Sequence, residues 1–481
     1  MAEEIDISTV KSRAVKGMAT LTGGGVILAV ISTIGVGFIT AYLGPKEFGL
    51  YGLVGSIIVI LSYFSDIGLA ASLIQKKESL TTTDLRTTFT IQQTLVTTLV
   101  ALAFVFSPLI KNYYNLATPE YWLLLALLFS FFISSLKSIP SVMLERSLRF
   151  DLIMLVRISE SLVFNITAVL LAINGFGIVS YIPAVIAQSL AGLILIYIFK
   201  SWPIGFAFSK DSLKKLLKFG IPYQANSLIA VAKDQFINLF LWKIVGASGM
   251  GFANWGFYYS QIPQRLIMDN ATKVAFPALS RFQDQPEQFR HSVEKLLQFI
   301  CLIIFPALAG IALLWSHLAL MVPKYFQWQP ALIPLYLYCF SAAMSCLSTP
   351  LTTTLYALGR AKVVSGLMVM WLVLEWALKP YFAIKFGFTG IAYATAIISI
   401  SSLVPFFIAK KIIGFSIITS LKTAIIPTLG MLIVGVLVHQ WGIFWTIALS
   451  ITTYLIGLWL IGGRQLMADI KPFYAYFKSK V

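Results

Sequence analysis

Charged side chains are scarce in this chain of 481 residues. Asp, Glu, Lys and Arg make up only 11% of it, and the mean hydropathy is +0.85. A soluble globular protein is about 25% charged, so this composition excludes a water-soluble surface. It predicts an all-α polytopic membrane protein.

Cysteine and histidine are also rare, with three residues of each type. The cysteines lie in apolar segments without CxxC spacing and the histidines are scattered, so we expect packing residues and no metal site. The chain lacks the GxxxxGK(S/T) pattern of an ATP-binding loop, and it offers no nucleophile–base constellation. We therefore expect no cofactor and a protein that is not an enzyme.

The sequence contains many long apolar runs. Breaks at Gly, Pro and charged residues divide the chain into fourteen segments. Each has about 20 residues, the length that crosses a hydrocarbon core of about 30 Å as a helix. The expected segments are 17–42, 48–74, 87–110, 120–143, 151–173, 178–199, 217–244, 250–279, 293–321, 330–357, 363–386, 389–409, 417–438 and 442–462. The first is longer than a signal-peptide core, so we expect it to be retained.

The basic residues support this count and give it an orientation. With the N-terminus on the cytoplasmic side, 26 of the 36 Lys and Arg fall in cytoplasmic regions and 6 on the opposite side. Cytoplasmic loops are enriched in basic residues, so we expect both termini in the cytoplasm. The net charge of +17 then reflects membrane orientation and not nucleic-acid binding.

Short stretches of the first half recur in the second half in the same order. The matched positions are Gly44 and Gly246, Gly49 and Gly251, Asp66 and Asp269, and Gly175 and Gly387; the first two pairs are each 202 residues apart. The repeat spans six helices, an even number, so both copies enter the membrane from the same side as parallel repeats.

Two six-helix lobes joined by a basic linker indicate a transporter that works by alternating access, with its site between the lobes near the midplane. The expected organisation is a cytoplasmic arm (1–16), an N-lobe (17–199), a cytoplasmic linker (200–216), a C-lobe (217–412), two further helices (413–463) and a cytoplasmic tail (464–481).

Four basic residues lie inside the predicted spans and not in loops. They are Lys233, Arg265, Lys273 and Arg157. A charge at the centre of a bilayer costs about 2.5–3.5 kcal/mol on insertion scales, and such residues usually face a bundle interior or a water-filled path. We interpret the four as the substrate-binding residues of a cationic cavity. Such a cavity suits a diphosphate, which Arg clamps with two hydrogen bonds and Lys attracts as a point charge.

Five carboxylates are candidates for ion coupling or charge balance: Asp66, Asp234, Asp269, Glu160 and Glu375. The alternative is self-neutralisation between residues three or four positions apart, where helix neighbours pair. Such pairs are Arg265–Asp269, Asp269–Lys273, Arg157–Glu160 and Glu375–Lys379. Lys233 and Asp234 are adjacent, so we expect them to point apart. The alternative for Asp66 is helix capping or lobe packing, and for Lys273 and Arg157 it is snorkelling to the interface.

Four stretches of the sequence are similar to segments of a known family. They are LGPKEFGLYG (43–52), DIGLAASLIQKKE (66–78), PSVMLERSLRF (140–150) and GFGIVSY (175–181). In these stretches the chain resembles the Wzx-type polysaccharide and oligosaccharide flippases, a polysaccharide transporter family of the MOP superfamily that is related to MurJ and MATE proteins. The resemblance covers nearly the whole chain and is clearest in its first 200 residues.

The resemblance implies a V-shaped pair of six-helix lobes with two extra C-terminal helices. It also implies that undecaprenyl-diphosphate-linked oligosaccharide crosses the cytoplasmic (inner) membrane for polysaccharide or lipopolysaccharide biosynthesis. The implied partners are this substrate, membrane lipids and, as further candidates, the polysaccharide polymerase and chain-length machinery. MurJ-type flippases use cavity arginines, and Arg265 looks comparable in position. In this chain Arg13 and Lys16 lie at the mouth of the first helix and not inside it. They therefore do not match the phosphate clamp of a MurJ-like first helix.

Two other functions stay open from the sequence. A cation-coupled small-molecule exporter of the MATE type shares the architecture but favours an acidic cavity, whereas this chain has at least as many basic as acidic buried positions. A membrane-embedded O-antigen ligase or polymerase usually needs a sizeable outer loop. In the segmentation above, no outer loop exceeds about a dozen residues.

Overall fold

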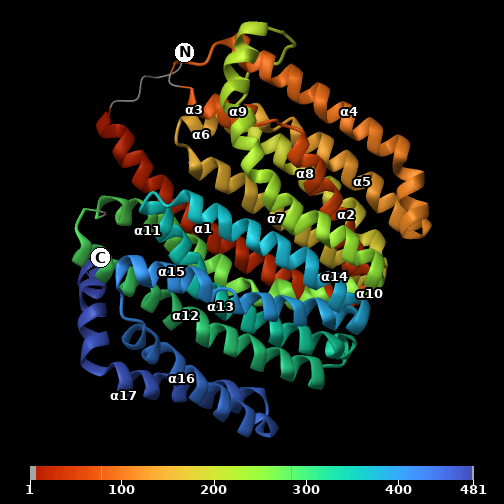
Figure 1. The fold of residues 1–481 in the computed structure, drawn as a ribbon. Coiled ribbons are helices and arrows are strands. Elements are labelled where there is room, and N and C mark those ends of the chain that lie inside the picture. Colours follow the sequence, from red (N-terminus) through yellow and green to blue (C-terminus); the bar gives the residue numbers. More distant parts are fainter. Residues whose placement is uncertain (1–6, 77, 283, 479–481) are drawn as a thin grey trace. The chain divides into compact units, whose positions relative to one another are not determined.

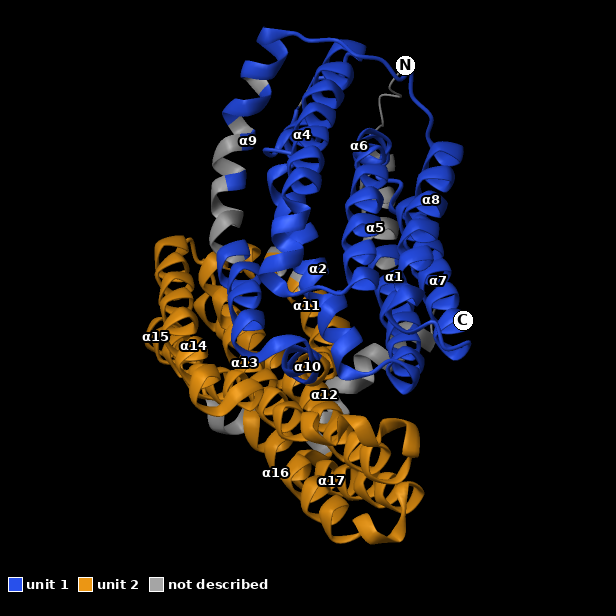
Figure 2. Cartoon of the chain, turned by 90° about the vertical axis from the view of Figure 1, so that its right-hand side faces the viewer, with its two compact units in different colours: residues 1–254 blue, residues 255–481 orange. Residues whose placement is uncertain are grey.

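The computed structural model describes the backbone of residues 7–76, 78–282 and 284–478, and within them every regular element is a helix (Figure 1). Side chains are described for the same residues except 7–19, 215, 219, 221–223, 225–230, 273–274, 277–278, 417–420 and 464–478. The chain divides into two compact units, residues 1–254 and 255–481 (Figure 2). The prediction of an all-α protein is confirmed.

The first unit contains the helices from α1 into α10. Their bounds are α1 Ile7–Tyr42, α2 Pro45–Phe64, α3 Leu69–Gln75, α4 Thr82–Tyr114, α5 Thr118–Ser135, α6 Ser138–Arg146, α7 Phe150–Ile173, η1 Gly177–Ser180, α8 Tyr181–Phe199, α9 Lys210–Val231, η2 Ala232–Phe236 and α10 Ile237–Ser260. In this unit α1 packs on α7, α7 on α8 and α8 on α5. Their shared core is closely packed, since Leu123, Leu124, Ala168 and Ala184 are fully buried.

The second unit contains the remaining helices. Their bounds are η3 Gln264–Met268, α11 Asp269–Arg281, α12 Pro286–Met321, η4 Pro323–Ala331, α13 Leu332–Ala357, α14 Ala361–Ile400, α15 Leu403–Ile413, α16 Ile417–Leu437, η5 His439–Trp441 and α17 Ile443–Lys478. The central helix is α12, which packs against both α13 and α16. The last two helices, α16 and α17, lie side by side at the C-terminal end of the chain (Figure 1).

Eleven stretches of the described residues are long and apolar enough to cross a membrane. Two of them, Ala232–Ser260 and Ala361–Ile413, each cover parts of two expected segments. They are kinked at Gly246 and Gly387, where φ is +73° and +62°. A multi-pass membrane protein is therefore confirmed, while the exact count of fourteen spans stays a prediction.

The expected segments 48–74, 120–143 and 389–409 are each divided between two helices, so the prediction of one continuous helix is wrong for them. The first breaks after α2, where Ile67 and Gly68 have φ of +48° and +74° before α3 begins. The second breaks between α5 and α6, and the third breaks at Ser401 and Ser402 between α14 and α15. The first two breaks each contain a charged residue, Asp66 or Lys137, and the third contains two serines. The apolar residues on both sides nevertheless make each segment look continuous in the sequence.

The matched glycines of the two repeats meet in the first unit. A Cβ on Gly49 would lie 1.9 Å from the carbonyl oxygen of Ala247, and a Cβ on Gly251 would lie 1.8 Å from that of Pro45. Positions 45 and 247 are themselves 202 residues apart, so each repeat presents its glycine to the equivalent carbonyl of the other. Two helix starts approach this closely only where glycine removes the side chain.

Candidate functional site

Lys233 and Arg265 each lie in a five-residue π-helix. Lys233 belongs to η2, which joins α9 to α10, and Arg265 belongs to η3, which leads into α11. π-Helical turns are rare, occur mostly as single bulges inside α-helices and are frequent at functional sites. The two cations therefore share a local geometry that an α-helical sequence pattern does not reveal.

The side chain of Lys233 lies beside that of Asp234. The Nζ–Oδ1 distance is 2.5 Å, and the two side chains are 23% and 52% exposed. We expected these neighbours to point apart, and that expectation is wrong. Because the pair is open on the aspartate side, Asp234 offsets the charge of Lys233 without enclosing it.

The guanidinium of Arg265 turns towards Tyr258 on the preceding helix. Its Nη2 donates to the Tyr258 carbonyl at 2.8 Å, and its Cζ lies 4.7 Å from the centre of the Tyr258 ring. The side chain is exposed, and no ion pair joins it to a carboxylate among the described residues. Arg265 thus keeps hydrogen-bond donors and its full charge available to an anion.

The other two candidate cations, Arg157 and Lys273, do not lie in π-helical turns. Arg157 on α7 is exposed, and its expected partner Glu160 pairs instead with Lys137, at the break between α5 and α6. The Lys137 and Glu160 side chains are 17% and 14% exposed, so this is a half-buried ion pair inside the first unit. The side chain of Lys273 lies outside the described residues.

The remaining carboxylates have distinct settings. Asp66 accepts hydrogen bonds from the backbone N–H of Ala70 at 3.0 Å and from Nε2 of Gln92 at 2.6 Å, which favours the helix-capping alternative. Glu375 lies 3.2 Å from Nζ of Lys379, the pair that self-neutralisation predicts. Asp269 is exposed in the first turn of α11.

The structure does not gather these residues into one compact cluster within either unit. Lys233, Asp234 and Arg157 belong to the first unit, and Arg265, Asp269 and Glu375 to the second. Within the described part of the chain, no group of three or more His, Cys, Asp or Glu side chains is arranged to hold a metal ion.

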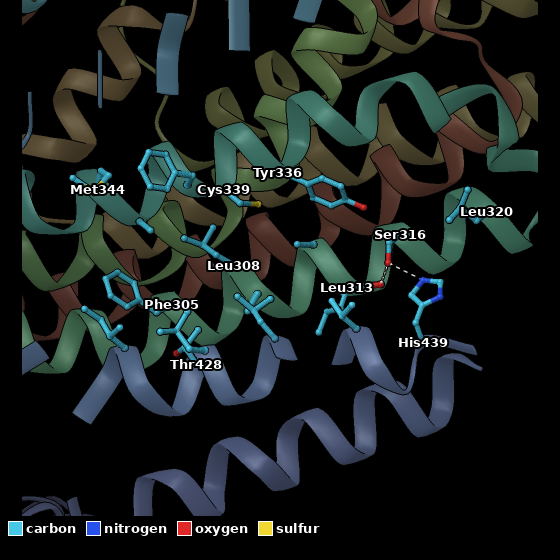
Figure 3. A pocket seen from close by; sticks show the side chains of 18 of the residues that line it. Phe305, Leu308, Leu313, Ser316, Leu320, Tyr336, Cys339, Met344, Thr428 and His439 are labelled. Atoms are coloured by element: carbon cyan, nitrogen blue, oxygen red, sulfur yellow. Dashed lines mark hydrogen bonds between the residues drawn. The ribbon is translucent and has the colours of Figure 1, made fainter. Parts of the chain in front are cut away.

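Sequence reasoning missed an apolar groove in the second unit. It has a volume of about 970 Å³ and lies between α12, α13 and α16 (Figure 3). Its walls are almost entirely apolar, as at Phe305, Leu308 and Met344, while Ser316 and His439 place polar atoms at one end. A long hydrocarbon chain with a polar terminus fits such a lining. Its walls come from the neighbouring helices α12 and α13 and from α16, which follows much later in the sequence, so no local pattern marks the groove.

Two histidines stand at the polar end of this groove. The His317 and His439 rings are 3.8 Å apart, and Nε2 of His439 lies 3.2 Å from Oγ of Ser316. Burial and the nearby His317 lower the pKa of His439 from its usual value. The ring nitrogens of His317 lie 3.0 Å from the Leu313 carbonyl and 3.1 Å from the His439 carbonyl, so the buried imidazole joins α12 to η5.

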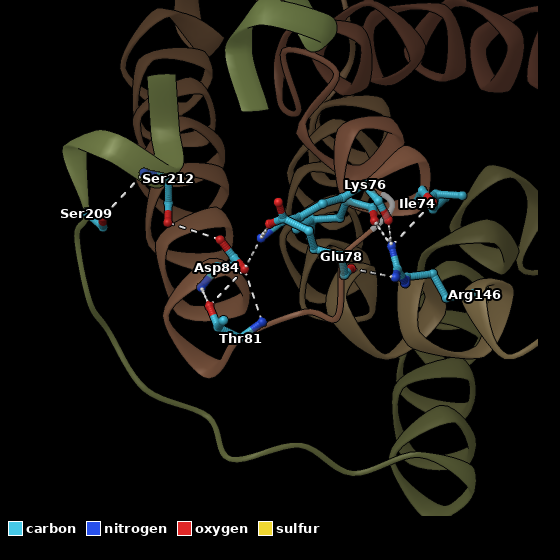
Figure 4. A network of polar contacts seen from close by, with 9 residues as sticks. Ile74, Lys76, Glu78, Thr81, Asp84, Arg146, Ser209 and Ser212 are labelled. Carbon is cyan, nitrogen blue, oxygen red and sulfur yellow. Dashed lines mark hydrogen bonds and ion pairs between the residues drawn. The ribbon is translucent and has the colours of Figure 1, made fainter. Parts of the chain in front are cut away.

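A polar network connects two of the family-like stretches in the first unit (Figure 4). Asp84 accepts from Lys76 at 2.7 Å and from Ser212 at 3.0 Å, and it forms a capping box with Thr81. Arg146 donates to the carbonyls of Leu73, Lys76 and Glu78, which lie at the end of α3 and just beyond it. The stretches 66–78 and 140–150 therefore form one structural joint between α3, α4 and α6.

This fold defines a class of protein, the multi-pass helical membrane proteins. The chain is similar to the lipid II flippase MurJ in its inward closed conformation, with a TM-score of 0.71 at 15% identity over 95% of this chain and 99% of that one. It is also similar to an inward-facing multidrug resistance transporter of the MATE family, with a TM-score of 0.63 at 14% identity over 80% of this chain and 94% of that one. At these identities the likeness shows the fold.

Residues 39–331 match the family described as polysaccharide biosynthesis protein, and the chain belongs to this family. Among its relatives, an uncharacterized membrane protein in the cps region of Klebsiella pneumoniae is 23% identical over 88% of this chain and 87% of the relative. The lipopolysaccharide biosynthesis protein WzxC of Escherichia coli (strain K12) is 25% identical over 70% of this chain and 69% of its own length. The teichuronic acid biosynthesis protein TuaB of Bacillus subtilis (strain 168) is 24% identical over 73% and 72%.

Proposed function

We propose that the protein is a flippase that moves undecaprenyl-diphosphate-linked oligosaccharide across the cytoplasmic membrane by alternating access. The observation that carries the proposal is the placement of Lys233 and Arg265, each in a π-helical turn. Lys233 lies at the start of the membrane-length stretch Ala232–Ser260, and Arg265 lies in the turn that leads into α11. Membrane helices retain charges where they line a path for a polar ligand. A diphosphate is the anionic group common to lipid-linked sugar carriers, and it matches two separate cations.

The two cations have different roles in this proposal. Arg265 presents a planar fork of N–H donors that matches phosphate oxygens bidentately, whereas Lys233 contributes a compact charge. Asp234 balances Lys233 when no substrate is bound, and the exposed Asp269 is a further candidate for charge balance. Arg157 and Lys273 remain candidate members of the same cationic path.

The groove of the second unit supports a lipid-linked substrate. Its apolar length suits a polyprenyl chain, and its polar end at Ser316 and His439 lies beside the last two helices. A small polar solute would not bind in such a lining, because burying a polar solute against hydrocarbon carries a desolvation cost.

The proposal includes an orientation and partners. Both termini lie in the cytoplasm, as the distribution of Lys and Arg indicates. The polysaccharide polymerase and the chain-length machinery would receive the translocated units on the other side. The polysaccharide-related names of WzxC and TuaB support this setting.

Leaflet-resolved transport tests the proposal. Purified protein is reconstituted in liposomes with a fluorescent undecaprenyl-diphosphate oligosaccharide, and the fraction accessible to a membrane-impermeant reagent is followed with time. We expect transport by the unaltered chain and a large loss in Arg265→Ala and Lys233→Ala. The matched control is Arg360→Ala, which removes an exposed arginine between α13 and α14. Equal transport by all variants would show that Arg265 and Lys233 do not bind the substrate.

A further inference from the structure

Residues 200–209, here called the linker strap, join α8 to α9 without regular structure, as the thin trace between these helices in Figure 2 shows. The strap is hydrogen-bonded along one face of α4. The backbone N–H of Ala207 donates to Oγ1 of Thr90 at 3.1 Å, and that of Ser209 donates to Oγ1 of Thr87 at 3.2 Å. These bonds hold an extended segment against a helix.

Both ends of the strap are anchored as well. Near its start, Trp202 is buried against the Phe89 ring at a centroid distance of 5.1 Å, and its Nε1 donates to the hydroxyl of Tyr197 at 3.2 Å. Just past its end, Ser212 donates to the buried carboxylate of Asp84 at 3.0 Å (Figure 4). The linker is therefore laid down on the first unit and is not a loose tether.

The anchored backbone sets the direction of the side chains between these points. In an extended chain alternate residues point to opposite sides. Residues 205, 207 and 209 are partly buried towards α4, whereas Ile204, Phe206 and Phe208 are 57%, 73% and 65% exposed. Three large apolar side chains thus form one mostly exposed row, in which the Phe206 ring also lies 5.7 Å from the Phe89 ring of α4. The distribution of Lys and Arg predicts that this segment is cytoplasmic.

The setting of this row points to lipid. On α4 the face that carries Thr90 continues through Thr97 and Ala101 to Phe104, which is 60% exposed on a membrane-length helix. The strap covers the beginning of that lipid-facing side. Basic side chains flank it, with Lys200 before the row and the exposed Lys210, Lys214 and Lys218 after it.

We propose that the linker strap inserts Ile204, Phe206 and Phe208 into the interface of the cytoplasmic leaflet and that its flanking lysines bind anionic phospholipid headgroups. An apolar row bordered by Lys is the pattern of interfacial segments, and the anionic leaflet attracts such clusters. The strap leads directly into α9, which continues into η2. Lipid contact thus holds the start of the helix that carries Lys233. The inference depends on the cytoplasmic orientation included in the proposed function, but not on the substrate.

Site-directed fluorescence tests this contact in the full chain. All three native cysteines are buried, so Phe206→Cys and Phe208→Cys each provide a labelling site for an environment-sensitive NBD fluorophore. Each protein is placed in nanodiscs of phosphatidylcholine alone or with phosphatidylglycerol. We expect blue-shifted emission that is quenched by a lipid spin-labelled near the headgroup, and a stronger effect with phosphatidylglycerol. Asp211→Cys, exposed in the first turn of α9, is the matched control, and there we expect water-like emission.

A second variant separates headgroup binding from insertion. In Phe206→Cys combined with Lys210→Gln, Lys214→Gln and Lys218→Gln, we expect the dependence on phosphatidylglycerol to be lost while the quenching in phosphatidylcholine remains. Water-like, unquenched emission at both 206 and 208 would overturn the proposal. Ile204, Phe206 and Phe208 would then be expected to contact a protein partner instead of lipid. Transport by Arg265→Ala is measured separately, so failure of the flippase proposal would not affect this result.

Discussion

Four hydrogen bonds from Lys76, Thr81 and Ser212 converge on the carboxylate of Asp84, whose side chain is only 5% exposed. At Arg265, by contrast, the guanidinium meets one carbonyl and one aromatic ring, and among the described residues no carboxylate pairs with it. At Asp84 the hydrogen-bonding capacity of the carboxylate is used to hold α3, α4 and α9 together. The arrangement at Arg265 leaves donors open, as a site that binds an anion transiently requires. Partner number therefore separates charges that hold the fold from charges that are free to act.

Removing Asp84 should have the largest effect on stability. In Asp84→Ala, Lys76 keeps a charge that is only 19% exposed and loses its closest partner, which costs about 3 kcal/mol or more when one member of a buried pair is deleted. We expect a strongly lowered thermal midpoint in detergent. Asp84→Asn keeps hydrogen-bonding atoms at the same position, so its thermal midpoint should lie between those of Asp84→Ala and the unaltered protein. A midpoint for Asp84→Ala equal to that of the unaltered protein would contradict the comparison.

Arg265 should show the opposite pattern. Arg265→Ala removes a charge-assisted contact worth about 1.5–3 kcal/mol with a bound anion, so we expect transport to fall by at least about tenfold with little change in thermal midpoint. Arg265→Lys keeps the charge but not the fork of donors, so partial activity is expected. Loss of stability without a selective loss of transport would place Arg265 with Asp84 as a structural residue.

The same contrast between closed and open packing exists at glycines of one helix. In α2, Gly49 faces the Ala247 carbonyl, whereas an ideal Cβ on Gly55 has no neighbour within 4 Å. Gly49→Ala should destabilise by about 1–3 kcal/mol through overpacking, and Gly55→Ala should be neutral or stabilise by up to about 1 kcal/mol through helix propensity. Thermal midpoints of the two variants measured side by side check this. Equal effects would mean that the repeat glycines do not form a close contact in solution.

Long-range composition predicted more of this molecule than local pattern did. Apolar segments and the Lys/Arg distribution indicate a multi-pass helical protein, because both depend on many residues at once. The glycine pairs were informative for a physical reason. Gly175 and Gly387, matched from sequence, both have positive φ, and Gly49 and Gly251 occupy a contact with no room for a side chain.

Features that depend on tertiary contacts were missed. Glu160 pairs with Lys137 instead of Arg157, because a residue 23 positions away in sequence lies closer than the one three positions away. The π-turns at Lys233 and Arg265 interrupt helices that read as continuous, and the groove of Figure 3 is assembled from α12, α13 and α16. The candidate cations were found from sequence because charge inside an apolar run is visible there, while their surroundings are not.

The smallest expected effect concerns His439, at the polar end of the groove, which like Arg265 is only lightly tied to the protein. Its pKa is lowered from 6.5 by burial and by His317, so the unfolded chain binds a proton at a higher pH than the folded chain does. The stability that neutral His439 contributes is therefore present above pH 6.5 and is lost as the pH falls below it. His439→Gln has no such group, so its thermal midpoint should decline less than that of the unaltered protein when the pH is lowered from neutral to about 5, near the edge of the histidine range. Parallel declines would show that His439 is solvated in the folded protein as in the unfolded chain, and the groove would then end in open water.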